Sequence, residues 1–341
     1  MYSFLNDYNE IAHPAVMQEL NSLVGKRYKN YGTDTLCAEV AEQVKRRIGQ
    51  NNADIHFFNG GTITNLTAIS HILRSHQAVI TVDSGHISTH ETGAIEATGH
   101  KVVTVVSESG KLTPAHIKKV LSEHGDEHTV QPKLVYVSNS TEIGTVYRKS
   151  ELVALRKACD DNGLFLFLDG ARLASGLMSK FSDLTIEDIA ELTDMFYIGG
   201  TKIGAFTGEV LVILNDKLKS DFRFSIKQRG GLQAKGWLLA AQFKALFEDD
   251  LYFKLGKHVN DTALQLSDFL EKQGYELLAP TESNQVFVIL PNPLTEKLLV
   301  KYELNKICEP EQGKTCVRLC TSWSTSQQDI DDFINFFTSL S

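Results

Sequence analysis

A single lysine stands in a glycine-rich turn of this sequence. Lys202 lies in "FYIGGTKIGAFTGE", residues 196–209, between two apolar runs that are typical of strands. A lysine on a helix face usually carries only a solvated charge, whereas a lysine held in a loop at a strand end is often part of a reactive site. There its amine can form a covalent bond with a carbonyl group.

Two charged residues follow another strongly apolar run. The segment "LFLFLDGAR" places Asp169 and Arg172 directly after a strand that we expect to be buried on both faces. A charge in that position needs a partner. The chain between Asp169 and Lys202 has the length of one helix plus one strand, so we expect the two residues at the ends of nearby strands.

A pair of glycines marks a third element. In "FFNGGTITNLTAISHIL" an expected strand passes through Gly60 and Gly61 into a helix that begins near Thr62. The free amides of a first helical turn, together with a hydroxyl group, bind anions, and phosphate groups in particular.

A lysine, a buried carboxylate and a phosphate-binding helix start together predict pyridoxal phosphate as the cofactor. Lys202 would hold it as a Schiff base, and Asp169 would keep its pyridine nitrogen protonated so that the ring withdraws electrons from a substrate carbanion. His86, in "DSGHISTHETGAIEATGH", follows another apolar run, where its imidazole would stack on the open face of the ring.

The elements that must position these residues alternate along the chain. Amphipathic segments such as "TPAHIKKVLSEHG" and "TIEDIAELTD" lie between short runs rich in Val, Ile and Phe. This alternation predicts an α/β fold with a mostly parallel sheet, which gathers ligands at the carboxyl ends of its strands. The runs expected to form strands are "DIHFFNGG", "AVITVDSG", "KVVTVVS", "KLVYVSN", "LFLFLDGA", "MFYIGG" and "GEVLVIL".

The pattern changes after about residue 233. The long helical stretch "QAKGWLLAAQFKALFEDD" leads to a second helix and then to "NQVFVIL", "CVRLCTSW" and "SQQDIDDFINFF", which indicates a smaller α+β domain. We place the large domain at residues 1–245, with its N-terminal segment contributing to the active site, and the small domain at residues 246–341.

Composition narrows the function classes. A chain of 341 residues with 42% apolar content can bury a large core. The net charge of -8 and the lack of a Lys/Arg-rich block favour small-molecule partners over nucleic acid or a membrane. No secretory or membrane-spanning segment is evident, so we expect a cytoplasmic protein. The five cysteines form no CxxC pair, which predicts reduced thiols and no metal site.

Several motifs in order give the chain a family resemblance. "NGGTITN", "SGHISTHETGAIEATGHKV", "FLDGARL", "GGTKIGAFTGE" and "VRLCTSW" resemble the threonine aldolase and β-eliminating lyase family of fold-type-I pyridoxal-phosphate enzymes over nearly the whole chain. The resemblance implies the fold-type-I architecture and retro-aldol cleavage of a β-hydroxy-α-amino acid, such as L-threonine or L-allo-threonine, to glycine and an aldehyde. It also implies a homo-oligomer, a dimer or a tetramer, with sites at a subunit interface.

The resemblance assigns roles to the residues singled out above. Lys202 matches the Schiff-base lysine, Asp169 the partner of the pyridine nitrogen, and His86 the stacking histidine. The phosphate-binding turn corresponds to Gly60, Gly61 and Thr62.

Further residues match positions that contact the substrate or the cofactor. Arg172 and Arg318 correspond to arginines that bind the cofactor oxygen or the substrate carboxylate, a task that suits the planar guanidinium fork. Asn6, in "FLNDY", stands where the family usually has serine, and Tyr31, in "KNYGTD", matches a tyrosine near the active site. Lys227 and Arg229, in "IKQRGG", are typical of a solvated loop; the alternative that the resemblance offers is a basic residue near here that reaches the neighbouring subunit's cofactor phosphate.

One position departs from the family pattern. Where many members have a histidine that handles the proton of the substrate β-hydroxyl group, this chain has Thr141. Threonine is not a base near neutral pH. The proton acceptor is therefore His86, a water molecule, or a carboxylate such as Glu91 or Glu142.

Other interpretations stay open at this point. The same constellation supports β-elimination or transamination of an amino acid, and a catalytically silent scaffold is a further alternative. Each motif also has a structural interpretation, because "DG" is a common turn dipeptide and an isolated histidine is often structural. A nucleotide-binding interpretation is disfavoured, because "NGGTITN" lacks the GxGxxG spacing.

Overall fold

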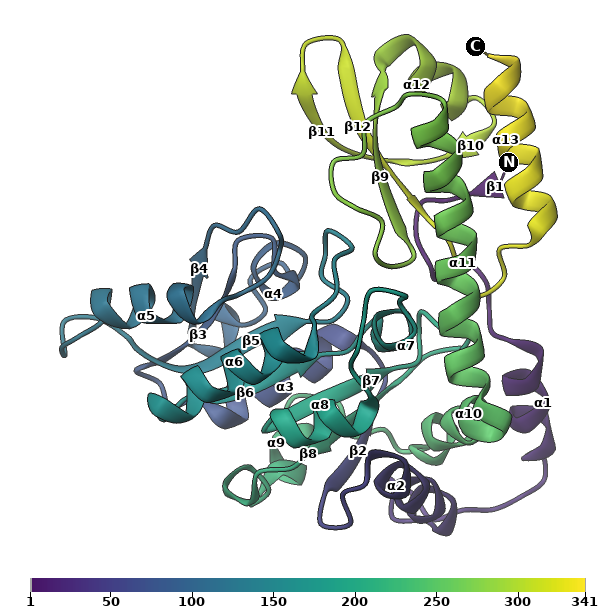
Figure 1. Cartoon of the computed structure of the whole chain (residues 1–341). Helices are drawn as coiled ribbons and strands as arrows, with labels where there is room; N and C mark the ends of the chain where they lie inside the picture. The colour runs from purple at the N-terminus through teal and green to yellow at the C-terminus, as the bar shows by residue number, and fades with distance from the viewer. Residues whose placement is uncertain (1, 341) are drawn as a thin grey trace.

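The computed structural model of the protein describes residues 2–340, in which the larger sheet has seven strands. Their order is β2-β8-β7-β6-β5-β3-β4, and only β8 runs against the others (Figure 1). Every run expected to form a strand does so, which confirms the mostly parallel α/β sheet. The strands are β2 (Asp54–Phe58), β3 (Gln77–Val82), β4 (Lys101–Val105), β5 (Gln131–Ser138), β6 (Phe165–Asp169), β7 (Met195–Gly199) and β8 (Glu209–Ile213).

Helices cover both faces of this sheet (Figure 1). Alternate strand residues belong to different apolar clusters: Leu166 and Leu168 pack on one side and Phe167 on the other. Burial on both faces explains why the strands read as continuous apolar runs. One face carries α2 (Thr35–Ile48), α5 (Pro114–Glu123), α6 (Lys149–Asp161), α8 (Ile186–Leu192) and α10 (Trp237–Phe247), and the other carries α3 (Gly61–Ile72) and α9 (Phe222–Gln228).

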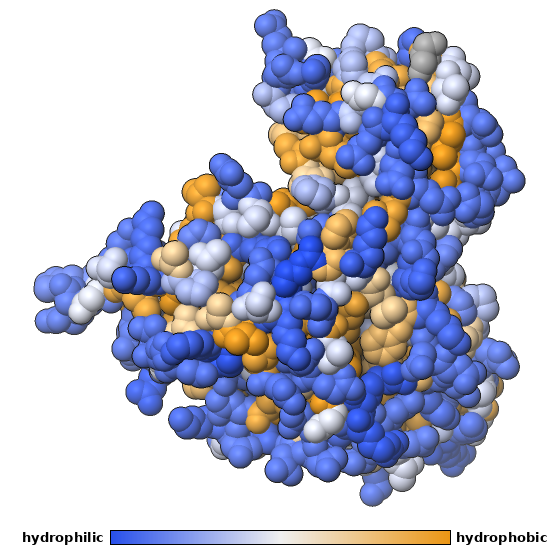
Figure 2. Space-filling view, in the orientation of Figure 1, coloured by the Kyte–Doolittle hydropathy of each residue, from blue (hydrophilic) through white to orange (hydrophobic). Residues whose placement is uncertain are grey.

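A smaller lobe follows α10. The long helix α11 (Leu251–Lys272) packs against a sheet in the order β11-β12-β9 and contributes to an apolar cluster of its own. Figure 2 shows a notch in the molecular outline between this lobe and the part of the large lobe that holds β4 and α5. The further elements are β9 (Gln285–Pro291), α12 (Asn292–Leu299), β11 (Asn305–Glu311), β12 (Lys314–Cys320) and α13 (Gln327–Ser339).

The N-terminal segment lies on the small lobe. Strand β1 (Tyr2–Ser3) pairs in parallel with β10 (Tyr302–Glu303), and the side chain of Phe4 is fully buried among small-lobe residues. From there the chain crosses to the large lobe, where α1 (Pro14–Ser22) packs beside α10. The first residues therefore connect the two lobes.

The parallel strands bring the chemically interesting segments to one edge of the large sheet. The loops after β3, β5, β6 and β7 all leave the sheet at its carboxyl edge. These loops lead into the short helix α4 (His86–Thr89), the Asn139–Gly144 turn, the short helix α7 (Leu173–Leu177) and the Lys202 turn.

Within residues 2–340, no helix has the length and apolar character needed to cross a bilayer.

Helices α7 and α11 make a close contact directly after the loop that carries Arg172. Gly256 of α11 lies against the backbone of Ala174 in α7, where an added Cβ would come within 2.4 Å of the carbonyl oxygen of Ala174. Gly256→Ala should therefore lower the free energy of unfolding by about 1–3 kcal/mol, because overpacking outweighs the higher helix propensity of alanine. Urea unfolding would measure the change.

The matched control is Gly125→Ala, where an added Cβ meets no atom within 4 Å. We expect this control to stay within about 0.5 kcal/mol of the wild type. Equal stability of both variants would contradict the packing argument.

Candidate active site

A cavity of about 560 Å³ lies between the two lobes. From the large lobe it is lined by His86, Glu142, Arg172 and Lys202, and from the small lobe by Arg318, among other residues. Its volume is in the range of small-molecule sites. The structure thus brings together five of the residues that the sequence singled out.

Glycines explain how the Lys202 turn meets the end of β6. An added Cβ on Gly199 would lie 2.6 Å from the carbonyl oxygen of Gly170, and one on Gly200 would lie 2.7 Å from that of Gly208. Both distances are too short for any side chain. The glycines therefore allow the loops after β6 and β7 to pack backbone against backbone.

Lys202 has no hydrogen bond or ion pair with any residue in the described part of the chain. Burial lowers the pKa of its amine, and the positive charge of Arg172 lowers it further, while nearby carboxylates such as Asp7 and Asp169 oppose the shift. A lowered pKa leaves more of the amine unprotonated. The unprotonated form is the nucleophile that attacks a carbonyl group.

Asp169 is buried, with 3% of its surface exposed, and it accepts four hydrogen bonds. Burial by itself disfavours the ionised carboxylate, but the positive charge of His86 and the hydrogen bonds outweigh it, so the pKa of Asp169 is lowered. No cation within residues 2–340 forms an ion pair with it. The donors are the hydroxyl groups of Tyr136 and Tyr197, the Asn65 amide at 3.0 Å and the Ala171 backbone N–H at 2.9 Å.

His86 is held by a buried acid. Its Nδ1 lies 2.8 Å from Oε1 of Glu91, which also accepts a hydrogen bond of 2.7 Å from Asn65. Burial opposes protonation of the imidazole, but the Glu91 hydrogen bond and the negative charge of Asp169 outweigh it and raise the pKa of His86. Glu91 thus lies behind His86, and it is not among the residues that line the cavity.

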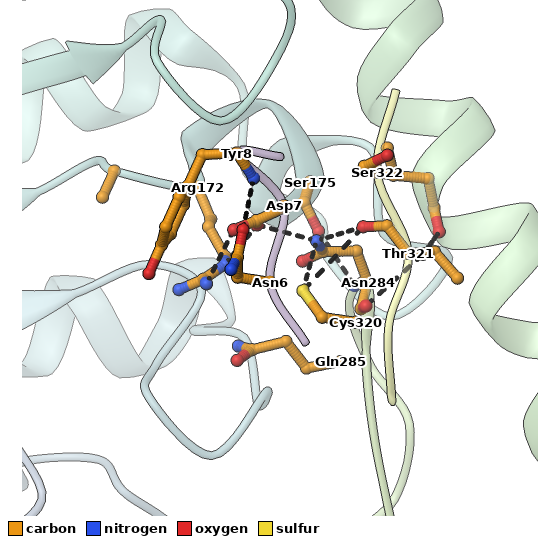
Figure 3. A network of polar contacts seen from close by, with 12 residues as sticks. Asn6, Asp7, Tyr8, Arg172, Ser175, Asn284, Gln285, Cys320, Thr321 and Ser322 are labelled. Carbon is orange, nitrogen blue, oxygen red and sulfur yellow. Dashed lines mark hydrogen bonds and ion pairs between the residues drawn. The ribbon is translucent and has the colours of Figure 1, made fainter. Parts of the chain in front are cut away.

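Arg172 forms a bidentate ion pair with Asp7, a residue that the sequence analysis did not assign (Figure 3). Nε lies 2.7 Å from Oδ2 and Nη2 lies 3.0 Å from Oδ1. Asn284 donates a third hydrogen bond to Asp7, at 3.0 Å. Burial disfavours the ionised form of Asp7, but the charges of Arg172 and Lys202 and these bonds outweigh it and lower its pKa.

Arg318 reaches the same cavity from β12. Its Nη1 donates to Gln285 at 3.1 Å, its Nη2 donates to the backbone oxygen of Leu5 at 3.0 Å, and its buried Nε has no partner in the described part of the chain. No described acidic side chain pairs with it. An arginine in this state is suited to bind a carboxylate ligand. Asn6 lies beside this region, where its side chain accepts a hydrogen bond of 2.9 Å from the Tyr8 backbone (Figure 3).

The N-terminus of α3 has the geometry expected of an anion site. The helix begins at Gly61, and no side chain caps its first turn. An added Cβ on Gly60 would meet no atom within 4 Å, so the space beside this turn is open. Thr62 is exposed at the first turn. The first-turn amides thus face no capping group of the protein.

Like Glu91, nine further residues considered from the sequence are not among those that line this cavity: Asn6, Gly60, Gly61, Thr62, Asp169, Thr141, Tyr31, Lys227 and Arg229. Thr141 is buried, and its hydroxyl group is bonded to that of Thr145 at 2.8 Å. Tyr31 lies in a separate hollow, where the Nζ of Lys227 is 4.4 Å from the centre of its ring. Arg229 follows α9. Within one chain, Tyr31, Lys227 and Arg229 are thus not brought to Lys202.

These observations test the fit of pyridoxal phosphate. Among residues 2–340, the Lys202 amine has no partner, the buried carboxyl group of Asp169 has a lowered pKa but no ion pair with a cation, and the first turn of α3 is uncapped. These features match the aldehyde, the pyridine nitrogen and the phosphate of this cofactor, respectively. The residues present therefore fit the cofactor. No group of three His, Cys, Asp or Glu residues within 2–340 is arranged to hold a metal ion.

Comparison with known families agrees with this geometry. The family model described as "Beta-eliminating lyase" matches residues 14–292, most of the chain. The chain belongs to the β-eliminating lyase family. This finding confirms the resemblance that the sequence motifs indicated.

Individual relatives place the chain within the β-eliminating lyase family. The low specificity L-threonine aldolase of Pseudomonas sp. (strain NCIMB 10558) is 36% identical over 276 residues, which cover 79% of this chain and 78% of the relative. A solved structure of Leishmania major threonine aldolase is 48% identical, with a TM-score of 0.98 and coverage of 100% and 99% of the two chains.

A more distant neighbour concerns the fold alone. A single mutant of aspartate aminotransferase from Thermus thermophilus is 16% identical, with a TM-score of 0.72 and coverage of 98% and 89%. Together with the threonine aldolase structure, it confirms the fold-type-I architecture predicted from the sequence.

Glu209, another residue that the sequence analysis did not single out, lies close to Lys202. Its side chain is 4% exposed and accepts hydrogen bonds from the Gly200 N–H at 3.0 Å and the Thr201 hydroxyl group at 2.8 Å. Burial raises the pKa of this carboxyl group from 4.5 to about 8, although both hydrogen bonds oppose the shift.

This raised pKa predicts how stability depends on pH. Between pH 4.5 and about 8 the folded protein binds this proton more tightly than the unfolded chain, so the contribution of Glu209 to stability decreases as pH rises. Glu209→Gln should remove that decrease, which is at most about 4 kcal/mol between pH 5 and 8. Urea unfolding of the cofactor-free proteins across this range would measure it, and an unchanged pH slope would contradict the assignment.

Proposed function

We propose that the protein is a pyridoxal-phosphate-dependent lyase that cleaves β-hydroxy-α-amino acids of the L-threonine type to glycine and an aldehyde. One observation carries the proposal. Lys202, whose amine has no hydrogen bond or ion pair among the described residues, and the buried Asp169, whose pKa is lowered, lie at the same edge of the large sheet. The names of the relatives, low specificity L-threonine aldolase and threonine aldolase, support the substrate class.

Each residue of the site has a task in this reaction. When bound, pyridoxal phosphate stabilises the negative charge left on the substrate Cα after the Cα–Cβ bond breaks. Lys202 would hold the cofactor through its amine, and Asp169 would favour the protonated pyridine nitrogen, an interaction that would gain strength as charge develops in the transition state. His86 would contact the ring, and Gly60, Gly61 and Thr62 would hold the phosphate.

Two arginines differ in their freedom to bind the substrate carboxylate. Arg172 is committed to Asp7 through two of its five donors, which leaves others to reach a ligand. Arg318 has no acidic partner among the described residues. Arg318 is therefore the main carboxylate-binding group, with Arg172 and Asn6 beside it.

The remaining features of the proposal concern organisation. The protein is a cytoplasmic homo-oligomer, a dimer or a tetramer, with a large domain at residues 1–245 and a small one at residues 246–341. Tyr31, Lys227 and Arg229 would then act on a neighbouring subunit's site. The exposed Phe224 beside Tyr31 and Lys227 is consistent with a contact surface there.

The first test is product release. Cofactor-loaded wild-type protein should release glycine and aldehyde from L-threonine, L-allo-threonine or L-phenylserine. Lys202→Ala should lose both turnover and the absorbance of the covalently held cofactor, because Lys306, the other lysine that lines the cavity, is exposed and paired with Glu296. The control is Lys254→Ala, an exposed lysine of α11, which should behave as wild type. Keto acid and ammonia in place of glycine would instead indicate β-elimination or transamination.

A second prediction concerns substrate affinity. Arg318→Gln should raise the KM for L-threonine by about 10-fold or more, because a charge-assisted bidentate contact with the carboxylate is lost. Cofactor affinity, measured by absorbance titration, should change little. A variant with unchanged KM would remove Arg318 from substrate binding.

A further inference from the structure

The proposed reaction requires a base that the family pattern does not supply here. As the Cα–Cβ bond breaks, the β-hydroxyl oxygen becomes an aldehyde oxygen and its proton must leave. Thr141 stands where many family members have a histidine. Its hydroxyl group is buried and bonded to Thr145, and it does not line the cavity. The acceptor must be sought among the other groups of the site.

Two of the alternative proton acceptors, His86 and Glu91, are hydrogen-bonded to each other. The raised pKa of His86 favours the imidazolium, which donates hydrogen bonds but accepts no proton, and its Nδ1 is already paired with Glu91. Glu91 lies behind His86 and is bonded to both His86 and Asn65. Glu91 thus offers no atom to the cavity, and His86 would accept a proton only through Nε2, in its neutral form.

Glu142 differs from both in its placement. It directly follows Thr141 and lines the cavity together with His86, Arg172 and Lys202. Its Oε1 accepts hydrogen bonds from the Ser138 hydroxyl group at 2.6 Å and from the His86 backbone N–H at 3.0 Å. Both bonds end on the same oxygen. The carboxyl group is thus anchored to other residues through one atom, and Oε2 forms no hydrogen bond with the side chain of another described residue.

We propose that Glu142 is the catalytic base that accepts the proton of the substrate β-hydroxyl group. The O–H bond breaks toward the carboxylate of Glu142, the oxygen electrons form the C=O bond of the aldehyde, and the electron pair of the Cα–Cβ bond stays on Cα. This inference rests on the proposed function. In the reverse direction the protonated Glu142 returns the proton.

The surroundings of Glu142 suit acid–base chemistry. Burial raises the pKa of its carboxyl group and the negative charge of Asp169 adds to the shift, while the Ser138 hydrogen bond and the charge of His86 oppose it. A raised pKa makes the ionised carboxylate a stronger base, and it brings the group closer to the neutral range in which proton transfer works best. Arg172 is the other charged group that interacts with it.

The test separates this proton from the rest of the chemistry. Glycine binds the same cofactor and exchanges a Cα proton with solvent, but it has no β-hydroxyl group. Glu142→Gln should therefore slow L-threonine cleavage by about 100-fold or more, while glycine proton exchange in D₂O, followed by NMR, stays within about threefold of wild type. Cofactor affinity, from absorbance titration, should also be unchanged.

Two control variants sharpen the comparison. Glu108→Gln changes an exposed acid outside the cavity and should match wild type in all three measurements. Thr141→Val should keep cleavage and exchange in the wild-type ratio, because its hydroxyl group does not face the cavity.

Each remaining outcome has a definite meaning. Equal loss of cleavage and exchange in Glu142→Gln would show that Glu142 positions the cofactor or His86, and would overturn the inference alone. Full cleavage in that variant would do the same. A wild-type protein that exchanges glycine protons yet cleaves no β-hydroxy amino acid would overturn the proposed function, and this inference with it.

Discussion

The buried ion pair between Asp7 and Arg172 is the interaction on which the site depends. It joins the N-terminal segment to the loop after β6, and Asn284 adds the small lobe to the same carboxylate. A buried charge without its partner costs several kcal/mol, so the native state is stable only when all three segments contact one another here. The same pair fixes the side chain of Arg172, which lines the cavity together with Lys202.

The other buried charges follow the same logic on a smaller scale. The positive charge of His86 and four neutral hydrogen-bond donors lower the pKa of Asp169, although no described cation forms an ion pair with it. Glu91 stabilises the charge of His86, while burial raises the pKa of Glu209 to about 8. Differences in neighbouring charge and hydrogen bonding thus shift the pKa values of Asp169 and Glu209 in opposite directions.

Much of this arrangement could be predicted from the sequence. The apolar runs of the large sheet are continuous because both faces are buried, so their positions were evident, and strand-end residues such as Lys202 and Asp169 were expected to meet. In "CVRLC" the two-residue period also places Arg318 on the opposite face of the strand from Val317 and Leu319, which enter the small-lobe core. Local patterns carry this information because the strand period is two residues.

Contacts between distant segments could not be predicted in the same way. Asp7 looks like an ordinary loop acid until the fold brings it to Arg172, and Tyr136 and Tyr197 look like core aromatic residues. Their hydroxyl groups bind Asp169 only because β5, β6 and β7 are neighbours in the sheet. The group that replaces a histidine at Thr141 could not be chosen from the sequence either, where Glu142 was one of several possible proton acceptors.

The pairing of β1 with β10 also determines when the site can form during synthesis. Tyr2 pairs with Tyr302, so the segment around Tyr2 must wait until residue 302 has left the ribosome. The large sheet can assemble earlier, since domains fold as units from the N-terminal side. Until residues 284–320 emerge, Arg172 lacks Asn284 and Arg318, which belong to the small-lobe side of the site. A nascent chain that has not reached residue 320 therefore carries an open, incomplete pocket.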